Sequence, residues 1–176
     1  KPPHRGHYEF AKKVAKRLGP SGELVIMVSP IGKPEVSPEQ SLKIWNKYLE
    51  APDAPDNIHV EIADYRSPVT SVYEFISDPV KAREGDTVLL IKSSKDEGDT
   101  RYDGAQSYAA RKNPGVAVDS LEEEPVVRPD GEPYHGQDAR EAISDDNLES
   151  FKKFLPTKAN AEEIWNIVKP LQTVER

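Results

Sequence analysis

Apolar residues recur at helical spacing near the start of the chain. Within Tyr8–Leu18 they stand three and four positions apart with basic residues between them, and Gly19-Pro20 follows. This pattern predicts an amphipathic helix that ends at the glycine. The next segment, Glu23–Ser29, is a nearly continuous apolar run, which is typical of a short strand buried on both faces of a parallel sheet.

The alternation of helix and strand patterns continues to about residue 120. Ser37 is a suitable N-cap and Pro38 a suitable first residue for a helix that carries an apolar stripe. The other predicted elements are a half-buried strand at Ile58–Ala63, a helix at Val69–Ile76, a second strongly buried strand at Asp86–Lys92, a helix at Tyr102–Lys112 and a strand at Val116–Val118. Helices that alternate with strands indicate an α/β domain in which a parallel sheet is flanked by helices.

The last third of the chain has a different pattern. Acidic residues and prolines interrupt the periodicity over Glu122–Pro133 and predict an exposed loop or hairpin. Three helical stretches follow, at Asp138–Ile143, Asp146–Leu155 and Ala161–Leu171. We expect a single domain over residues 1–176, with a core at 1–120, a loop at 121–134 and a C-terminal helical part at 135–176.

Composition and charge narrow the function classes. Lys and Arg number 24 and Asp and Glu 31, so the formal charge is −7, which disfavours nucleic acid as a partner. No cysteine is present, so disulfides, thiolate metal sites and cysteine nucleophiles are excluded. The apolar runs are far shorter than the ~20 residues that cross a bilayer. We therefore expect no membrane partner and a cytoplasmic location. The start at Lys1, without methionine, is consistent with a trimmed form of a longer chain.

Two histidines stand where the first predicted helix begins, in the segment Pro2-Pro3-His4-Arg5-Gly6-His7. His4 and His7 are three positions apart, so both can face one bound group. Gly6 allows a ligand to approach the free amide groups of a helix N-terminus. Because imidazoles donate hydrogen bonds to phosphate oxygens, the segment predicts an anion site. The alternatives are a metal pair, for which no third ligand stands nearby, and plain surface histidines.

This segment resembles the P-x-H-x-G-H signature of the HxGH-motif nucleotidylyltransferases, which include adenylyltransferases for nicotinamide mononucleotide and phosphopantetheine as well as cytidylyltransferases. The resemblance implies a Rossmann-like fold in which the motif follows the first strand, so that this strand would precede Lys1. It also implies that Pro3, Gly6 and His7 bind the nucleotide and that His4 and His7 act in catalysis.

A second stretch resembles the Ser-x-Thr-x-x-Arg signature with which these enzymes bind the triphosphate at the start of a helix. The matching residues are His135-Gly136-Gln137-Asp138-Ala139-Arg140. His135 and Gln137 replace the two hydroxyl residues, and both can donate hydrogen bonds to phosphate. The resemblance makes His135, Gly136, Gln137 and Arg140 nucleotide-binding residues, and Arg140 catalytic as well. Considered by itself, Arg140 would be an ordinary arginine on a helix surface.

A third segment, Ser93-Ser94-Lys95-Asp96, follows a predicted strand at the edge where open α/β sheets bind ligands. It resembles a Gly-Ser-Lys-Asp segment of some viral and bacterial members of the nicotinamide mononucleotide branch. The resemblance assigns Lys95 to the nucleotide, and Ser94 and Asp96 to the acceptor substrate. The alternative for this segment is a solvated, charged loop. Ser29, at the end of the predicted strand Glu23–Ser29, is a further candidate for acceptor binding.

The resemblance implies the transfer of AMP from ATP, or of CMP from CTP, to a phosphate-bearing acceptor such as nicotinamide mononucleotide, with release of pyrophosphate. The acceptor oxygen attacks the α-phosphorus, and no protein nucleophile is needed. Mg²⁺ would bridge phosphate oxygens and keep most of its water, so no metal site in the protein is expected.

Other interpretations remain open at the level of the sequence. A cytidylyltransferase of the same fold is the nearest, because the first motif contacts phosphates and does not select the base. A non-catalytic nucleotide-binding or structural module would explain the altered second signature. A different phosphate-binding α/β enzyme would make the first motif a coincidence. Members of the superfamily are often oligomers, so a homo-oligomer is also left open.

Overall fold

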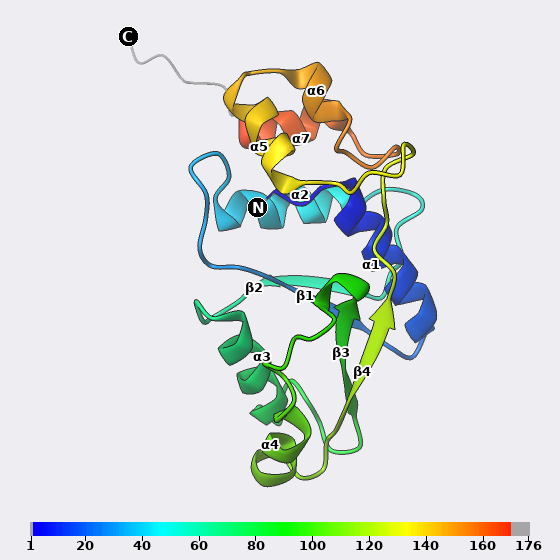
Figure 1. Ribbon diagram of the computed structural model, residues 1–176, viewed down its shortest axis with the longest axis vertical. Coiled ribbons are helices and arrows are strands. Elements are labelled where there is room, and N and C mark those ends of the chain that lie inside the picture. Colours follow the sequence, from blue (N-terminus) through cyan, green and yellow to red (C-terminus); the bar gives the residue numbers. More distant parts are fainter. Residues whose placement is uncertain (1, 170–176) are drawn as a thin grey trace. The chain divides into compact units, whose positions relative to one another are not determined.

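The computed structural model describes residues 2–169, and Figure 1 shows the order of their helices and strands. The elements are α1 (Arg5–Leu18), β1 (Leu24–Val28), α2 (Pro38–Leu49), β2 (Ile58–Ile62), α3 (Pro68–Ser77), β3 (Thr87–Ser93), a 3₁₀ turn η1 (Ser94–Asp96), α4 (Ala105–Lys112), β4 (Ala117–Glu123), α5 (Gly136–Ser144), α6 (Leu148–Lys152) and α7 (Ala161–Val168). The alternation of helices and strands, followed by C-terminal helices, confirms the predicted α/β class.

The described residues cluster into two compact units. The first unit consists of residues 2–62 and 126–169, and the second of Ala63–Pro125. β1 pairs in parallel with β2 in the first unit, and β3 pairs in parallel with β4 in the second. The sequence predicted one parallel sheet, whereas the strands of the described chain form two sheets of two strands each.

The strands are less buried than their apolar sequences predicted. Leu24 is buried, but the remainder of β1 is half-buried, and β3 is exposed at Thr87 and half-buried beyond it. Within residues 2–169 each of these strands pairs along one edge only. Its surface is therefore less covered than that of a central strand in a larger parallel sheet.

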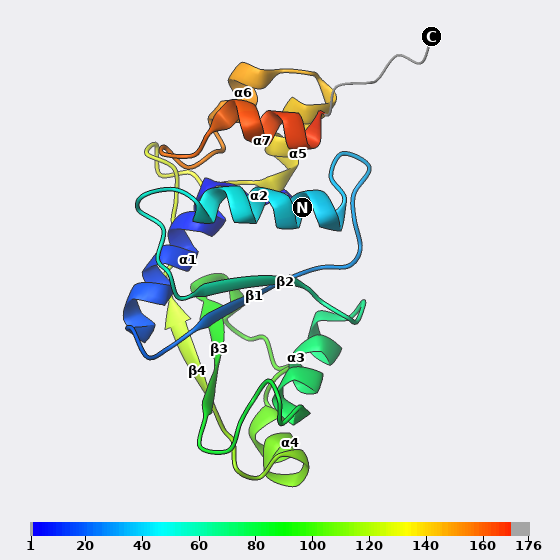
Figure 2. The ribbon, with the colours of Figure 1, turned by 180° about the vertical axis from the view of Figure 1, so that it is seen from behind.

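In the first unit, helices pack on the β1–β2 pair and on one another. α1 contacts β1, and α2 contacts both strands. The C-terminal helices α5, α6 and α7 lie beyond α2, which α7 contacts (Figure 1, Figure 2). Trp45 packs against Tyr48 and Trp165 against Phe151, so both tryptophans take part in the packing of this unit. The largest of the fully buried side chains in this unit are those of Tyr8, Ile44, Tyr48, Phe151 and Ile164.

The second unit has a smaller core between the β3–β4 pair and helices α3 and α4. Its buried members are Ile76, Ala105, Ala109 and Val118. Asn113 fixes the segment that follows α3, because its side-chain Nδ2 donates to the carbonyls of Ile76 and Ala82. Within residues 2–169, no helix combines the length and the apolar character that crossing a membrane would require.

Local side-chain contacts set the helix starts. Ser37 caps α2 and forms a reciprocal capping box with Gln40, as the Ser37-Pro38 pair predicted. Ser67, ahead of Pro68, caps α3 by accepting a hydrogen bond from the N–H of Thr70, so α3 begins one residue before its predicted start. α1 begins at Arg5, earlier than predicted, because His4 acts as its N-cap.

Other element ends differ from the prediction. β4 continues to Glu123, past its predicted end, because its backbone stays in register with β3. The segment after β4 forms a hairpin closed by a bridge between Val127 and Pro133, consistent with the predicted loop or hairpin. α6 is shorter than predicted, since Asn147 caps it and Lys153 ends it. α7 ends at Val168, and its predicted end at Leu171 lies outside the described residues.

Candidate functional site

α1 begins at a reciprocal pair of histidines. Nδ1 of His4 accepts a hydrogen bond from the backbone N–H of His7 at 3.4 Å, and Nδ1 of His7 accepts one from the N–H of His4 at 3.1 Å. The two rings stack with their centroids 3.7 Å apart. Because each Nδ1 is an acceptor, a neutral ring carries its proton on Nε2. The capping box therefore fixes both the orientation and the tautomer of the two imidazoles.

The backbone amides at this helix start are bound by the protein itself. The N–H of Arg5 donates to the carbonyl of Phe154 at 2.6 Å, and the N–H of His7 donates to His4. The prediction that free amides receive a ligand here is wrong for these two groups, because the chain supplies acceptors for both. His7 is exposed whereas His4 is 6% exposed, so the imidazole of His7 is the more accessible donor.

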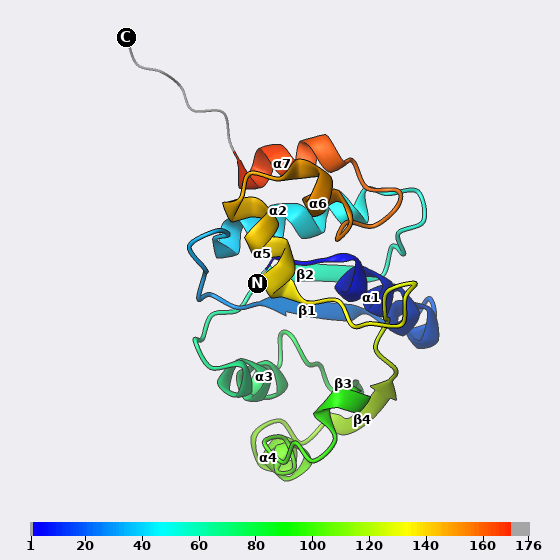
Figure 3. The same cartoon turned by 45° about the horizontal axis from the view of Figure 1, so that its top comes forward.

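Tyr134 joins the second motif to the first. Its ring stacks on His4 with the centroids 5.5 Å apart, and it directly precedes His135 in the chain. Figure 3 shows the first turn of α5 next to the segment that leads into α1. A Cβ on Gly6 would lie 2.9 Å from Cδ2 of Tyr134 and 2.9 Å from Cε1 of His4. Gly6 thus makes room for these two rings, a close approach that the sequence assigned to a ligand.

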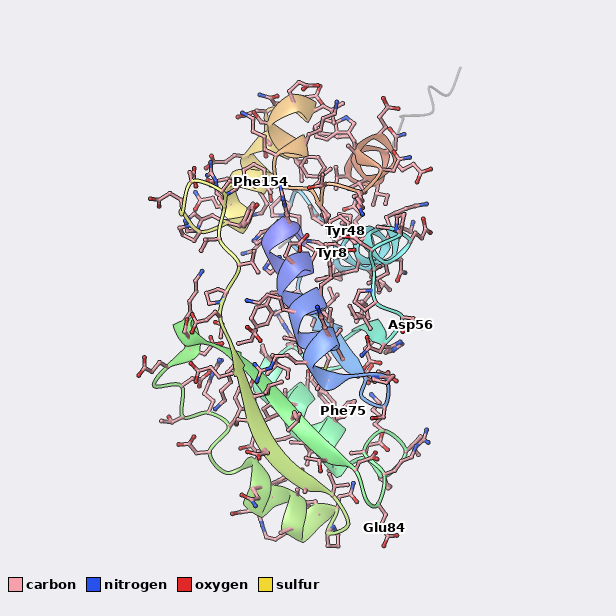
Figure 4. All side chains as sticks on the ribbon, turned by 90° about the vertical axis from the view of Figure 1, so that its right-hand side faces the viewer. Tyr8, Tyr48, Asp56, Phe75, Glu84 and Phe154 are labelled. Atoms are coloured by element: carbon pink, nitrogen blue, oxygen red, sulfur yellow. The ribbon has the colours of Figure 1, made fainter. Side chains whose placement is uncertain are left out.

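A buried tyrosine of α2 holds the residues that precede α1. The hydroxyl of Tyr48 donates to the carbonyl of Pro3 at 2.7 Å, and burial raises the pKa of Tyr48. Pro3, a predicted nucleotide-binding residue, is buried and has its carbonyl occupied in this way. In Figure 4 Tyr48 lies close to Tyr8, and Phe154 lies over the first turn of α1. Hydrogen bonds to Tyr48 and Phe154 therefore hold the start of the histidine motif in place.

A polar cluster on the side of α1 adds to this support. Asp53 accepts hydrogen bonds from Lys12 at 2.7 Å and from the hydroxyl of Tyr8 at 2.9 Å. The hydrogen bond from Lys12 is the main reason why the pKa of Asp53 is lowered. Burial, with the bond to Asp53, raises the pKa of Tyr8. These contacts tie α1 to the residues that follow α2.

α5 begins differently, with an open pocket at its first turn. His135 occupies the N-cap position, but its side chain makes no capping hydrogen bond. The pocket has a volume of about 420 Å³ and is lined by His135, Gln137, Asp138 and Arg140. Nε of Arg140 is buried and has no hydrogen-bond partner among the described residues. A guanidinium N–H without an acceptor, at an uncapped helix N-terminus, favours an anionic ligand.

Two features of α5 work against simple anion binding. Gln137 donates its side-chain Nε2 to Glu141 at 3.2 Å, so this donor is already engaged. Asp138 places a carboxylate in the first turn, where it complements the helix dipole but repels an anion. A phosphate in this pocket is better accommodated when a cation accompanies it. In residues 2–169, no group of three or more His, Cys, Asp or Glu residues could hold a metal ion alone.

The third predicted segment belongs to the second unit, and most of its polar groups are engaged locally. Oδ2 of Asp96 accepts from the N–H of Ser93 at 2.9 Å, and the hydroxyl of Ser94 donates to Glu124 at 3.1 Å. Asp99 just beyond is bound by Arg101, whose hydrogen bonds lower the pKa of Asp99 to about 2. The side chain of Lys95 is exposed. In the first unit, Ser29 is exposed and its Oγ accepts from the N–H of Ile31 at 3.2 Å.

The structure therefore brings His4 and Gly6 against Tyr134, the residue directly before the second motif. Neither motif includes Tyr134, although an aromatic residue at this position was a visible signal in the sequence. The chain matches no protein-family model, no curated protein sequence and no solved structure.

Proposed function

We propose that the protein is a nucleotidylyltransferase that transfers AMP from ATP to a phosphate-bearing acceptor such as nicotinamide mononucleotide and releases pyrophosphate. The contact between Tyr134 and His4 is the observation that carries this proposal. The two motifs lie about 130 positions apart in the chain, and they were predicted separately to bind parts of one triphosphate. A shared site requires that they be neighbours, and this ring contact makes them so.

In the proposed reaction the protein aligns the substrates and neutralises charge. An acceptor phosphate is already ionised at neutral pH, so no strong general base is needed. His7 donates from Nε2 to the phosphate whose charge grows in the transition state. His4 holds the ring of His7 by stacking and capping, and Arg140 donates Nε–H to the β- and γ-phosphates.

The strand pairing is consistent with a Rossmann-like fold. In the doubly wound order 3-2-1-4-5, strands 2 and 3 are neighbours, and so are strands 4 and 5. Each of the parallel pairs β1–β2 and β3–β4 joins strands that follow one another in the chain, as such neighbours do.

Magnesium fits this pocket as a companion of the substrate. When bound, Mg²⁺ would balance the charge of the phosphates, and it commonly takes only one or two carboxylates from a protein. Asp138 is the carboxylate that lines the pocket and that would face a phosphate unfavourably without a cation. We propose that this residue favours the magnesium complex of the nucleotide over the free nucleotide.

Pyrophosphate release is the test. Purified protein with Mg²⁺ is given ATP or CTP with nicotinamide mononucleotide, phosphopantetheine or choline phosphate as the acceptor. Release that depends on one pair of substrates identifies the base and the acceptor together. Release with CTP alone would replace the adenylyl transfer proposed here by cytidylyl transfer.

A non-catalytic nucleotide-binding module is the second candidate. It is favoured by the bond from Gln137 to Glu141, which engages a side chain that the reaction would need for phosphate. Binding of ATP in calorimetry, without pyrophosphate release from any pair, would support this candidate and overturn catalysis.

A further inference from the structure

A tight turn follows β1 and carries a glutamate at its tip. Lys33 and Val36 form an antiparallel bridge, in which the N–H of each donates to the carbonyl of the other at 3.0 and 3.1 Å. Pro34 and Glu35 are the two central residues of this turn. Proline at the first central position fixes the backbone φ angle there, so the backbone position of Glu35 is well defined.

Contacts on both sides hold this turn. Val36 is 1% exposed, and so anchors the turn in the core of the first unit. A Cβ on Gly32 would lie 2.9 Å from Cδ of Pro38, so the chain before the turn is pressed against the first residue of α2. The capping box of Ser37 fixes the start of α2. A side chain presented by such a turn is preorganised.

One carboxylate oxygen of Glu35 is buried without a hydrogen-bond donor among the described residues. Oε2 is buried and has no hydrogen-bond partner in the part of the chain that the structure describes. A buried acceptor without a donor is unfavourable, and native proteins rarely retain one without a reason. A group that satisfies this oxygen as a hydrogen-bond acceptor must supply a hydrogen-bond donor or a positive charge.

The turn lies at an edge of the sheet that suits a substrate. It follows the carboxyl end of β1, where open α/β sheets bind their ligands. α1 is joined to β1 by a short connection and contacts it, and Figure 1 and Figure 3 show α1 and β1 running in roughly opposite directions. The start of α1, with His4 and His7, therefore lies toward the carboxyl end of β1. Glu35 and the histidines are therefore on the side of the first unit where acceptor and nucleotide would meet.

We infer that Glu35 binds the end of the acceptor that does not carry the phosphate, through an amide N–H, and that it selects against a negative charge there. This inference rests on the proposed function, because that function supplies the acceptor. It adds a specificity residue that neither motif contains. The turn residues predict a preference between two acceptors that differ by a single group.

The test compares nicotinamide mononucleotide, which carries a carboxamide, with nicotinate mononucleotide, which carries a carboxylate in its place. Calorimetric titration without ATP measures the affinity for each. The full chain is expected to bind the amide at least tenfold more tightly, since like charges at close range repel. Glu35→Gln is expected to reduce this preference to about threefold or less. Glu39→Gln, an exposed glutamate four positions on, is the matched control and should leave the preference unchanged.

Glu35→Asp keeps the charge on a shorter side chain and should retain the preference with a lower affinity for both compounds. It serves as a second variant if Glu35→Gln does not fold, as judged by thermal unfolding. An equal preference in the full chain and in Glu35→Gln would overturn the inference. So would the lack of binding of either compound to the full chain. Binding is measured without turnover, so an intact amide preference without pyrophosphate release would reject the proposed reaction while retaining the role of Glu35.

Discussion

Two helices of the first unit begin at a histidine, and they use it in opposite ways. His4 caps α1, and its partner His7 returns the bond, so the first turn of α1 is closed by side chains. His135 stands at the same position of α5 but makes no capping bond. The residue type and position are the same, yet one helix start is complete and the other is open.

The two helix starts differ in the groups that they can still offer to a ligand. At α1 the amides of Arg5 and His7 have protein acceptors, and the polar groups that the motif adds are the two imidazole rings. At α5 the amides lack a side-chain cap, and Arg140 adds a buried Nε–H without an acceptor. We therefore expect the start of α1 to contribute shape and a positioned donor, and the start of α5 to contribute affinity for an anion.

The largest expected effect comes from His7. His7→Ala removes both the acceptor for the N–H of His4 in the capping box and the Nε2 donor, whereas His7→Asn offers Oδ1 as an acceptor for the N–H of His4 and removes only the Nε2 donor. Both are expected to slow pyrophosphate release by about two to three decades, or roughly 3 to 4 kcal/mol of transition-state stabilisation. In urea unfolding, His7→Ala should lose about 1 kcal/mol of stability and His7→Asn less.

His59→Ala is the matched control for this pair. His59 is an exposed histidine of β2 that contacts Glu61, so its loss should leave the rate of pyrophosphate release unchanged. If His7→Asn kept the full rate, the histidines would serve only to cap α1, and the distinction drawn between the two helix starts would fail.

Arg140 is the next test, at the open helix start. Arg140→Gln is expected to weaken binding of magnesium ATP roughly tenfold to a hundredfold, the range for a hydrogen bond to a charged group. The free protein should not lose stability, because the buried Nε has no partner to lose. Calorimetric titration and urea unfolding measure the two quantities. Arg128→Gln, in the hairpin before α5, removes an arginine paired with Asp130 and controls for net charge. Lower stability with unchanged affinity would assign Arg140 to structure alone.

The sequence predicted the fold where the pattern is local. The apolar stripe of α1 and the Ser37-Pro38 start of α2 depend on residues a few positions apart, and the structure confirms both. The burial of β1 and β3 was overestimated, because an apolar run shows that a strand can be buried but not how many neighbours it has. The end of β4 was missed since its polar sequence follows β3 only through pairing in space.

The candidate site was predictable in part. The reciprocal histidines follow from their spacing of three, but their effect on the amides of α1 depends on Phe154, which is distant in the sequence. The contact of Tyr134 with His4 and the unpaired Oε2 of Glu35 likewise arise from packing between distant segments. Motif spacing therefore identifies donors, while the tertiary structure decides which of them are already engaged.

Gly6 tests whether the two helix starts are coupled. Alanine in place of glycine within a helix usually stabilises it, by up to about 1 kcal/mol. Here the added Cβ would meet the rings of His4 and Tyr134 at 2.9 Å, so Gly6→Ala is expected to destabilise the protein by about 1 to 3 kcal/mol. Urea unfolding measures this change. Tyr134→Ala should relieve part of the clash, so the double variant should lose less than the sum of the single variants. A more stable Gly6→Ala protein would show that the rings are not held against this glycine.

The smallest expected effect comes from adding a side-chain cap to α5. His135→Ser supplies a hydroxyl at the N-cap of α5 and should stabilise the protein by roughly 0.5 to 1 kcal/mol. Asn160→Ala makes the opposite change at α7, where Asn160 accepts from the N–H of Glu163 at 3.2 Å, and should cost a similar amount. Thermal unfolding compares the two variants. Equal stability of His135→Ser and the original chain would mean that the first-turn amides of α5 are already satisfied. The contrast with α1 would then rest on Arg140 alone, and the affinity for phosphate would have to come from its guanidinium rather than from the helix.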